Sequence, residues 1–110
     1  METAKDIIKK LIHDLTTDLI NSNEIVLGQI AQANAAGFLV NNYKIDADFT
    51  DSSKNKINFR ATIELKGKQD SQGFYCNDQM SIRVTGTAIK GEGDWKVDDI
   101  AVVECNLKRD

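Results

Sequence analysis

The chain has 110 residues, a length that favours one domain and is too short for two independent hydrophobic cores. Fourteen Lys and Arg side chains against seventeen Asp and Glu give a net charge of -3. This balance disfavours nucleic acid as the main partner, because phosphate binding needs a concentrated positive surface. No segment has the apolar length of a membrane span or of a signal peptide, so the sequence predicts a cytoplasmic protein with no membrane partner.

The first third of the chain has the periodicity of amphipathic helices. One helical face collects Ile8, Leu11, Ile12, Leu15 and Leu19. This spacing predicts a helix over about 3–20, with Thr3 as its N-cap and Asp6 placed to complete a capping box. The segment Asn21-Ser22-Asn23 supplies a turn or a second N-cap, and a second helix follows over about 23–36. A single kinked helix over 3–36 is an alternative that the pattern leaves open.

From residue 39 the apolar period changes to two, which predicts four strands over about 39–50, 56–66, 79–90 and 95–107. In the first hairpin, a turn centred at residue 53 pairs Tyr43 with Ile63 and Phe49 with Ile57. Both hairpins are apolar on one side only. The sequence therefore predicts an α+β domain with two N-terminal helices packed on one face of a four-stranded antiparallel meander sheet.

The second hairpin has the turn formers Gly91-Glu92-Gly93-Asp94 at its centre. A regular register about this turn gives the pairs Met80–Cys105, Ile82–Val103, Val84–Ala101, Gly86–Asp99, Ala88–Val97 and Lys90–Trp95. Nearly all of these pairs are apolar on both strands, so this face is expected to meet the core. The mismatch is Gly86 opposite Asp99, where a bulge or a close backbone approach is expected.

A candidate pocket lies between the predicted helices and sheet. The regular register directs Asp99 inward, and an inward carboxylate with a raised pKa is a signal of a functional site. A bulge that turns Asp99 outward is the alternative. Trp95 alternates inward with Val97 at the end of the same strand, so Tyr43, Trp95 and Asp99 are the residues expected near the mouth of the pocket.

The same register predicts an interaction surface on the outer face of the sheet. It places Ile89, Ile100 and Val102 there, and a contiguous group of exposed β-branched residues is typical of a dimer or partner interface. A bulge at Asp98–Asp99 would move the last two inward and remove the patch. The loop over 67–79 adds Phe74 and Tyr75, which either cap the core or anchor a partner.

The remaining polar side chains favour structural roles. His13 is the only histidine and lies at the flank of the first helix beside Asp14, which argues against a catalytic base and against a histidine metal site. Asp46, Asp48 and Asp51 lack the glycine and final glutamate of a calcium loop. We therefore predict a solvated acidic face, with no metal and no cofactor.

The chain has two cysteines, Cys76 and Cys105. In the regular register they stand roughly 13 Å apart along an extended chain, which is beyond the reach of a disulfide. We predict free thiols. A reactive Cys76 is disfavoured because its acidic neighbour Asp78 raises the pKa of a thiol.

The segment Gly93-Asp94-Trp95-Lys96-Val97-Asp98-Asp99-Ile100 resembles the NTF2-like and cystatin-like α+β superfamilies, many of whose members end in a strand that opens Gly-x-Trp-Lys-Ile/Val. The resemblance implies a sheet curled around helices and dimerisation through the outer face of the sheet. Some members are enzymes with Asp/His pairs in the cone, and many are binding or scaffold modules. No histidine lies in the predicted strands of this chain, so the resemblance assigns it no catalytic residue.

These patterns predict a non-enzymatic binding module that forms a homodimer or binds a protein partner through the outer sheet face and the 67–79 loop. One alternative is a small-ligand pocket protein, enzymatic or not. Another is an acidic inhibitor or immunity-type protein, in which the loop carboxylates Asp70 and Asp78 would contact the target.

Overall fold

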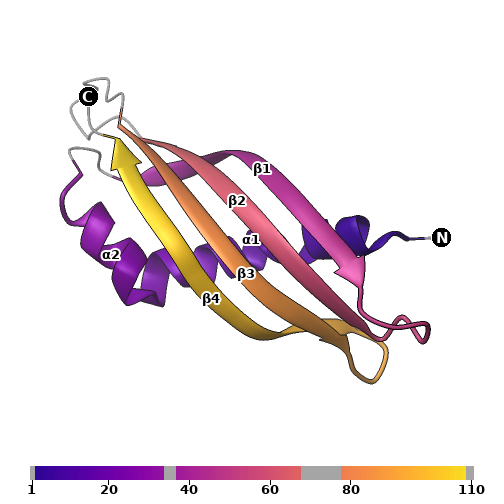
Figure 1. The fold of residues 1–110 in the computed structure, drawn as a ribbon. Coiled ribbons are helices and arrows are strands. Elements are labelled where there is room, and N and C mark those ends of the chain that lie inside the picture. Colours follow the sequence, from indigo (N-terminus) through magenta and orange to yellow (C-terminus); the bar gives the residue numbers. More distant parts are fainter. Residues whose placement is uncertain (1, 34–36, 68–77, 109–110) are drawn as a thin grey trace.

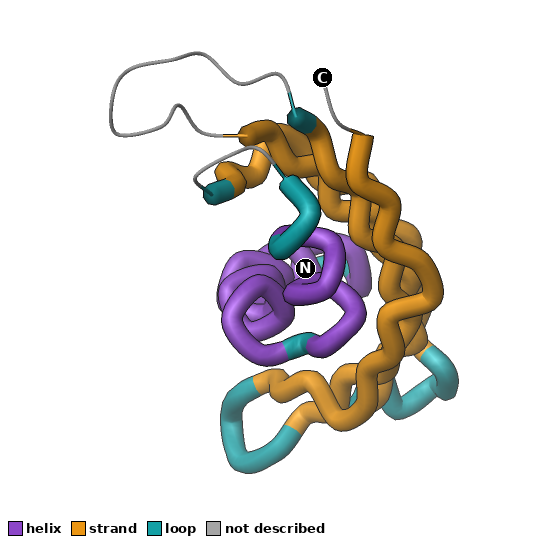
Figure 2. Tube along the Cα trace, turned by 90° about the vertical axis from the view of Figure 1, so that its left-hand side faces the viewer, coloured by secondary structure: helices purple, strands orange, loops and turns teal. Residues whose placement is uncertain are grey.

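The computed structural model describes residues 2–33, 37–67 and 78–108. The element order is α1 (Ala4–Ser22), α2 (Glu24–Ile30), β1 (Phe38–Phe49), β2 (Lys56–Gly67), β3 (Gln79–Lys90) and β4 (Trp95–Lys108). The strands form one antiparallel sheet in the order β1-β2-β3-β4, which confirms the predicted α+β fold with a meander sheet (Figure 1). The sheet is curved, and both helices lie on its concave side (Figure 2).

The two helices begin where the sequence predicts. The Thr3 hydroxyl accepts a hydrogen bond from the Asp6 N–H, and the Asp6 carboxylate accepts one from the Thr3 N–H, which completes the capping box. Asn23 has an extended backbone and separates the helices, and its side chain caps α2 by accepting from the N–H groups of Ile25 and Val26. The alternative of a single kinked helix over 3–36 is therefore wrong.

The second helix is shorter than predicted, because α2 ends at Ile30. Only Val26 of this helix is fully buried. The next two residues, Ala31 and Gln32, are exposed in a turn. With so little apolar surface to pack, nothing offsets the cost of continuing a helix that already contains Gly28.

The core lies between α1 and the concave face of the sheet. α1 contributes its apolar stripe, with Ile8 and Ile12 each only 1% exposed. The inner rows of β2 and β3 are buried along their length and comprise Ile57, Phe59, Ala61, Ile63, Leu65, Met80, Ile82, Val84 and Ala88. Most residues in the corresponding rows of the outer strands are half-buried, because β1 and β4 form the edges of the sheet, and only Phe38 and Cys105 of these rows are buried.

The predicted register of the first hairpin is confirmed. Tyr43 pairs with Ile63 and Phe49 with Ile57, and pairing runs without a shift over 42–49. One irregularity lies between Val40 and Asn42, near the start of β1. The regular alternation of apolar and polar residues in this hairpin allowed its register to be deduced.

The second hairpin follows the predicted register only next to the turn. Lys90 pairs with Trp95 and Ala88 with Val97, but two irregularities then shift β4 along β3. The first leaves Asp98 as an extra residue, so Gly86 pairs with Ile100 rather than with Asp99. Beyond the second, the observed pairs are Ile82–Cys105 and Met80–Leu107. The regular pairing predicted for this hairpin is wrong beyond Val97.

The two bulges keep apolar side chains on the concave face. After the first bulge, Ile100 and Val102 turn inward and pack against the core. After the second, Cys105 and Leu107 do the same. Without these extra residues, the alternation of β4 would point Asp99 into the core and leave β-branched residues in solvent.

Candidate functional site

A groove of about 760 Å³ lies between α1 and β1. Six consecutive residues of the edge strand, from Phe38 to Tyr43, line it, and they include the irregularity between Val40 and Asn42. Because β1 is an edge strand and contributes consecutive residues to the lining, the groove runs along the open edge of the sheet. We call it the helix–strand groove.

One face of α1 forms the other wall. It contributes Lys9, His13, Thr16, Thr17 and Ile20, which recur at the three- and four-residue spacing of a helical face. The Thr16 hydroxyl is already used, since it donates to the Ile12 carbonyl oxygen at 2.7 Å. Lys9 and His13 are the basic side chains of the lining, and none of the described residues that line the groove carries a carboxylate.

The strand wall has an apolar end. Leu39 is 59% exposed and Val40 37% exposed, although both belong to a strand. α1 and β1 run in opposite directions (Figure 1), so these residues lie towards Ile20, while Tyr43 lies towards Lys9. The groove thus offers an apolar end and a basic end.

At alternate residues of β1, the backbone N–H and C=O groups point away from β2, towards the open edge of the sheet. The ladder begins at Thr50, whose N–H donates to the Lys56 carbonyl oxygen at 2.9 Å. Hydrogen-bonded and non-hydrogen-bonded pairs alternate in an antiparallel ladder. The even-numbered residues over 42–48 therefore bond to β2, and the N–H and C=O groups of Tyr43, Ile45 and Ala47 point to the open edge.

The opposite edge of the sheet is less suited to accept a strand. Bulges at Asp98 and Val103 divide β4 into short segments, and none of them offers a long regular ladder of backbone groups. Bulges on an edge twist it away from incoming strands and are a common protection against edge pairing. Of the two edges, β1 offers the longer uninterrupted run, over 42–49.

The structure separates the three predicted pocket residues. Tyr43 is partly buried and lines the helix–strand groove. Trp95 packs at the far end of the sheet, with its ring centroid 6.3 Å from that of Phe49. Asp99 is exposed and pairs with Thr87, because the bulge at Asp98 turns it outward. Of the two orientations that the sequence left open, the outward one is confirmed and the inward one is wrong.

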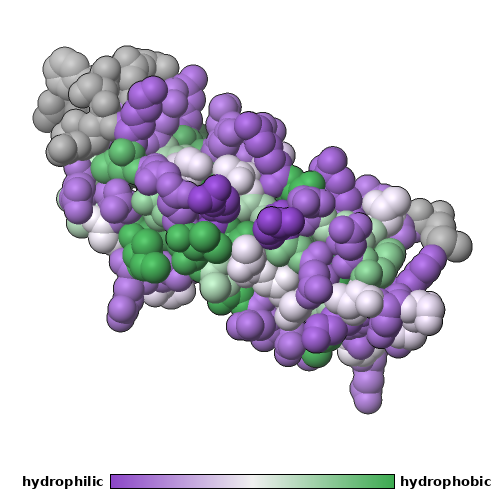
Figure 3. All heavy atoms as spheres, viewed as in Figure 1, coloured by the Kyte–Doolittle hydropathy of each residue, from purple (hydrophilic) through white to green (hydrophobic). Residues whose placement is uncertain are grey.

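The predicted apolar patch on the outer face is not formed. Ile100 and Val102 turn inward after the bulge, and only Ile89 of the three stays outside, at 36% exposed. Phe74 and Tyr75 lie outside the described residues. Figure 3 shows this convex face as mostly hydrophilic, with apolar atoms gathered where β4 runs beside α2. On β4, the bulge residue Val103 is 55% exposed.

Charged residues on the convex face form cross-strand pairs. Lys44 lies 3.1 Å from Glu64, and Arg60 lies 4.0 Å from Asp46. Arg83 and Glu104 form a further pair between β3 and β4. The convex face is therefore polar, and these charged side chains are paired across neighbouring strands.

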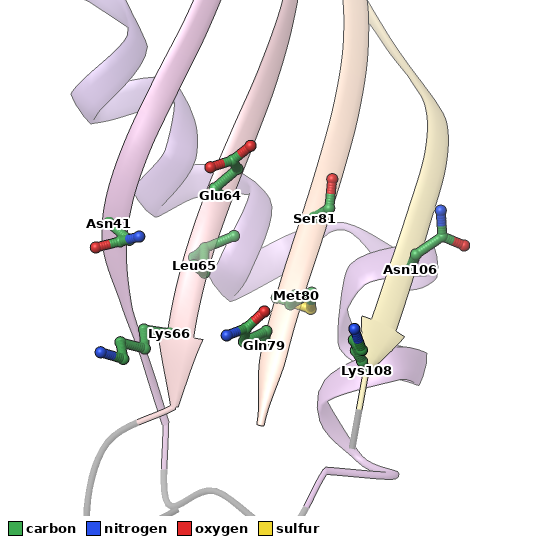
Figure 4. Close-up of a pocket in the computed structure, with 9 residues that line it drawn as sticks. All are labelled: Asn41, Glu64, Leu65, Lys66, Gln79, Met80, Ser81, Asn106 and Lys108. Atoms are coloured by element: carbon green, nitrogen blue, oxygen red, sulfur yellow. The ribbon is translucent and has the colours of Figure 1, made fainter. Parts of the chain in front are cut away.

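A second hollow of about 430 Å³ lies on the sheet end where β2 and β3 lead into residues 68–77. Its lining comes from all four strands and comprises Asn41, Glu64, Leu65, Lys66, Gln79, Met80, Ser81, Asn106 and Lys108. Figure 4 shows these side chains spread across the sheet without converging on one point. Since a binding site needs convergent polar groups, we assign this hollow no role.

The histidine and the described cysteine of the chain form no catalytic or metal-binding group. The His13 ring is exposed, and its Nδ1 lies 3.7 Å from the Asp14 carboxylate. Cys105 is a buried free thiol, and burial raises the pKa of this thiol. Within residues 2–33, 37–67 and 78–108, no group of His, Cys, Asp and Glu is arranged to hold a metal ion.

Asp78 was a candidate surface carboxylate of an acidic inhibitor, and Asp70 lies outside the described residues. Asp78 is fully buried, so it does not present a charge to a target. Its backbone carbonyl oxygen accepts a hydrogen bond from the Gly67 N–H at 2.8 Å, which joins the ends of β2 and β3. The structural role of Asp78 removes one of the two residues on which the inhibitor interpretation rested.

The helices of the described chain include none with the length and apolar character needed to span a membrane. The sequence and fold were also compared with known proteins. No family model, no curated protein and no solved structure matches this chain.

Proposed function

We propose that this chain is a non-enzymatic protein-interaction module that binds through the edge of β1 and the adjoining helix–strand groove. The observation that carries the proposal is the lining of the groove by consecutive residues of an edge strand, over Phe38–Tyr43. An exposed strand edge beside a groove is the arrangement used for strand addition, in which backbone hydrogen bonds give affinity and pockets for alternate side chains give specificity. This differs from the sequence-based expectation, which placed the interaction on the outer face.

Two features of the groove support binding over catalysis. Leu39 and Val40 are exposed apolar side chains on its strand wall, where they can contact a partner. The exposed His13 lacks the desolvated cleft and the close hydrogen-bonding partner of a general base, since Asp14 is 3.7 Å away.

Site-specific photo-crosslinking tests the proposal. A benzophenone amino acid in place of Leu39 is expected to give a discrete protein adduct in cells that express the full chain. The matched control carries the same group in place of Lys96, which is exposed near the turn end of β4. Adducts of equal yield from both positions, or none from Leu39, would contradict the proposal.

A second candidate is a small anionic ligand in the same groove, which shares only Tyr43 with the small-ligand pocket expected from the sequence. The supporting observation is that Lys9, His13 and Tyr43 line a space of about 760 Å³ to which the described part of the chain contributes no carboxylate. A fragment screen by protein-observed NMR, using aromatic carboxylates as probes, tests it. Shifts confined to Lys9, His13 and Tyr43, and lost in Lys9→Glu, are expected, and uniformly small shifts would exclude it.

A further inference from the structure

We propose that the partner of the β1 edge is a second copy of this chain, paired antiparallel about a two-fold axis at Ile45. The two sheets, each of four strands, then join into one continuous sheet with all helices on the same side. This inference rests on the proposed function, because it names the partner of the same edge. It agrees with the homodimer expected from the sequence and moves the interface from the outer face to the edge.

The backbone geometry fits this register. Tyr43, Ile45 and Ala47 direct their N–H and C=O groups to the open edge, as the ladder from Thr50 requires. About an axis at Ile45, the hydrogen-bonded pairs are Ile45 with the partner's Ile45 and Tyr43 with the partner's Ala47. Every residue that faces the edge with its backbone thus meets a residue that does the same.

The charges select this register over its neighbours. Lys44 comes opposite the partner's Asp46 in a non-hydrogen-bonded pair, the position where side chains are closest. Moving the axis to residue 46 sets Asp46 against itself, and moving it to residue 44 sets Lys44 against itself. An axis between residues is excluded because it would bring the apolar face of one copy against the polar face of the other.

The existing ion pairs extend this contact. Lys44 already lies 3.1 Å from Glu64, and Asp46 lies 4.0 Å from Arg60. Across the interface, side chains of alternating charge form a row in the order Glu64, Lys44, the partner's Asp46 and the partner's Arg60. The two-fold axis produces this row twice. Alternating rows of this kind hold register better than an isolated surface pair does.

The concave side supplies apolar contact. Tyr43, Ile45 and Ala47 are partly buried and pack against the core, whereas their β2 neighbours Ile63 and Ala61 are 0% and 2% exposed. The edge row is therefore the part of the core that the single chain leaves incompletely covered. Pairing through a single strand edge buries a small area, so the dimer is expected to fall in the weak, transient class.

Charge reversal and mixing test the proposal by sedimentation velocity on the full chain. Lys44→Asp and Asp46→Lys each place like charges at both symmetric contacts, so each variant alone is expected to dimerise about 10- to 100-fold more weakly than the original chain. An equimolar mixture of the two variants restores opposite charges at both contacts. The mixture is expected to form a heterodimer with roughly the original affinity.

The control reverses a charge on the same face away from the edge. Arg83→Asp breaks the pair with Glu104 between β3 and β4 and is expected to leave dimerisation unchanged. Circular dichroism and thermal unfolding of each variant establish that it is folded. If a single variant does not fold, the double variant Lys44→Asp/Asp46→Lys, which is expected to dimerise, replaces the mixture.

Two results would overturn the inference. One is an original chain that stays monomeric at high micromolar concentration, and the other is a mixture that associates no better than its components. After either result, the crosslinking at Leu39 still decides whether the proposed function holds. An adduct with a different protein there supports the edge as a binding site without self-pairing, and the absence of any adduct removes both.

Discussion

The backbone carbonyl oxygen of Asp99 approaches Gly86 so closely that a Cβ on residue 86 would lie 2.4 Å from it. The same Cβ would lie 2.8 Å from the Phe59 ring. This contact occurs beside the bulge at Asp98, where β4 shifts along β3. Gly86 therefore allows β4 to pass close to β3 at the bulge, beyond which Ile100 and Val102 of β4 face the core.

Gly86→Ala is expected to destabilise the fold by about 1–3 kcal/mol, because the added methyl group must displace backbone or a buried ring. Urea unfolding followed by circular dichroism measures the change. The matched control is Gly28→Ala in α2, where a Cβ meets nothing within 4 Å. That change is expected to stabilise by about 0.5–1 kcal/mol, and equal effects of the two substitutions would refute the close approach.

The capping box at the start of α1 predicts a pH dependence. The hydrogen bond from the Thr3 backbone N–H, with a second from its side chain, holds the pKa of Asp6 below its ordinary value. A lowered folded-state pKa contributes stability above the ordinary pKa, and this stability is lost as the pH falls through the folded-state value. Asp6→Asn is therefore expected to unfold at lower urea than the original chain at neutral pH. The difference should disappear in acid, and a difference that persists there would contradict the assignment.

The buried Cys105 thiol predicts slow chemical modification. Burial raises the pKa of this thiol, so little thiolate forms at neutral pH, and the side chain packs among inward residues of β3 and β4. Iodoacetamide is expected to modify Cys105 only at the rate at which the chain opens. Mass spectrometry of the peptide that contains Cys105, with and without urea, measures this. Rapid modification of the folded chain would show that the thiol is accessible.

The sequence was sufficient for the layers and for one hairpin. In β1 and β2, uninterrupted alternation fixes which residues face the core, and the turn near residue 53 then determines the pairs, such as Tyr43 with Ile63. In β4 the same arithmetic fails after Val97, because an extra residue changes which side every later side chain faces. The mismatch of Gly86 with Asp99 signalled the first bulge, but nothing comparable marks the second.

The site was less accessible to sequence reasoning. Tyr43 was identified, but His13 was interpreted only as a flank residue of its helix. The four-residue spacing of Lys9 and His13 was the available signal, and it shows a basic stripe without showing what lies beside it. That neighbour, the edge of β1, is fixed by tertiary packing between α1 and the sheet.

Amide hydrogen exchange along β1 tests the central claim most directly. In dilute solution, the N–H groups of Tyr43, Ile45 and Ala47 are expected to exchange faster than those of Lys44 and Asp46, which bond to β2. At high micromolar concentration, the three edge amides should become protected while the other two change little. Edge amides that exchange at the same rate at both concentrations would contradict pairing of two chains through this strand.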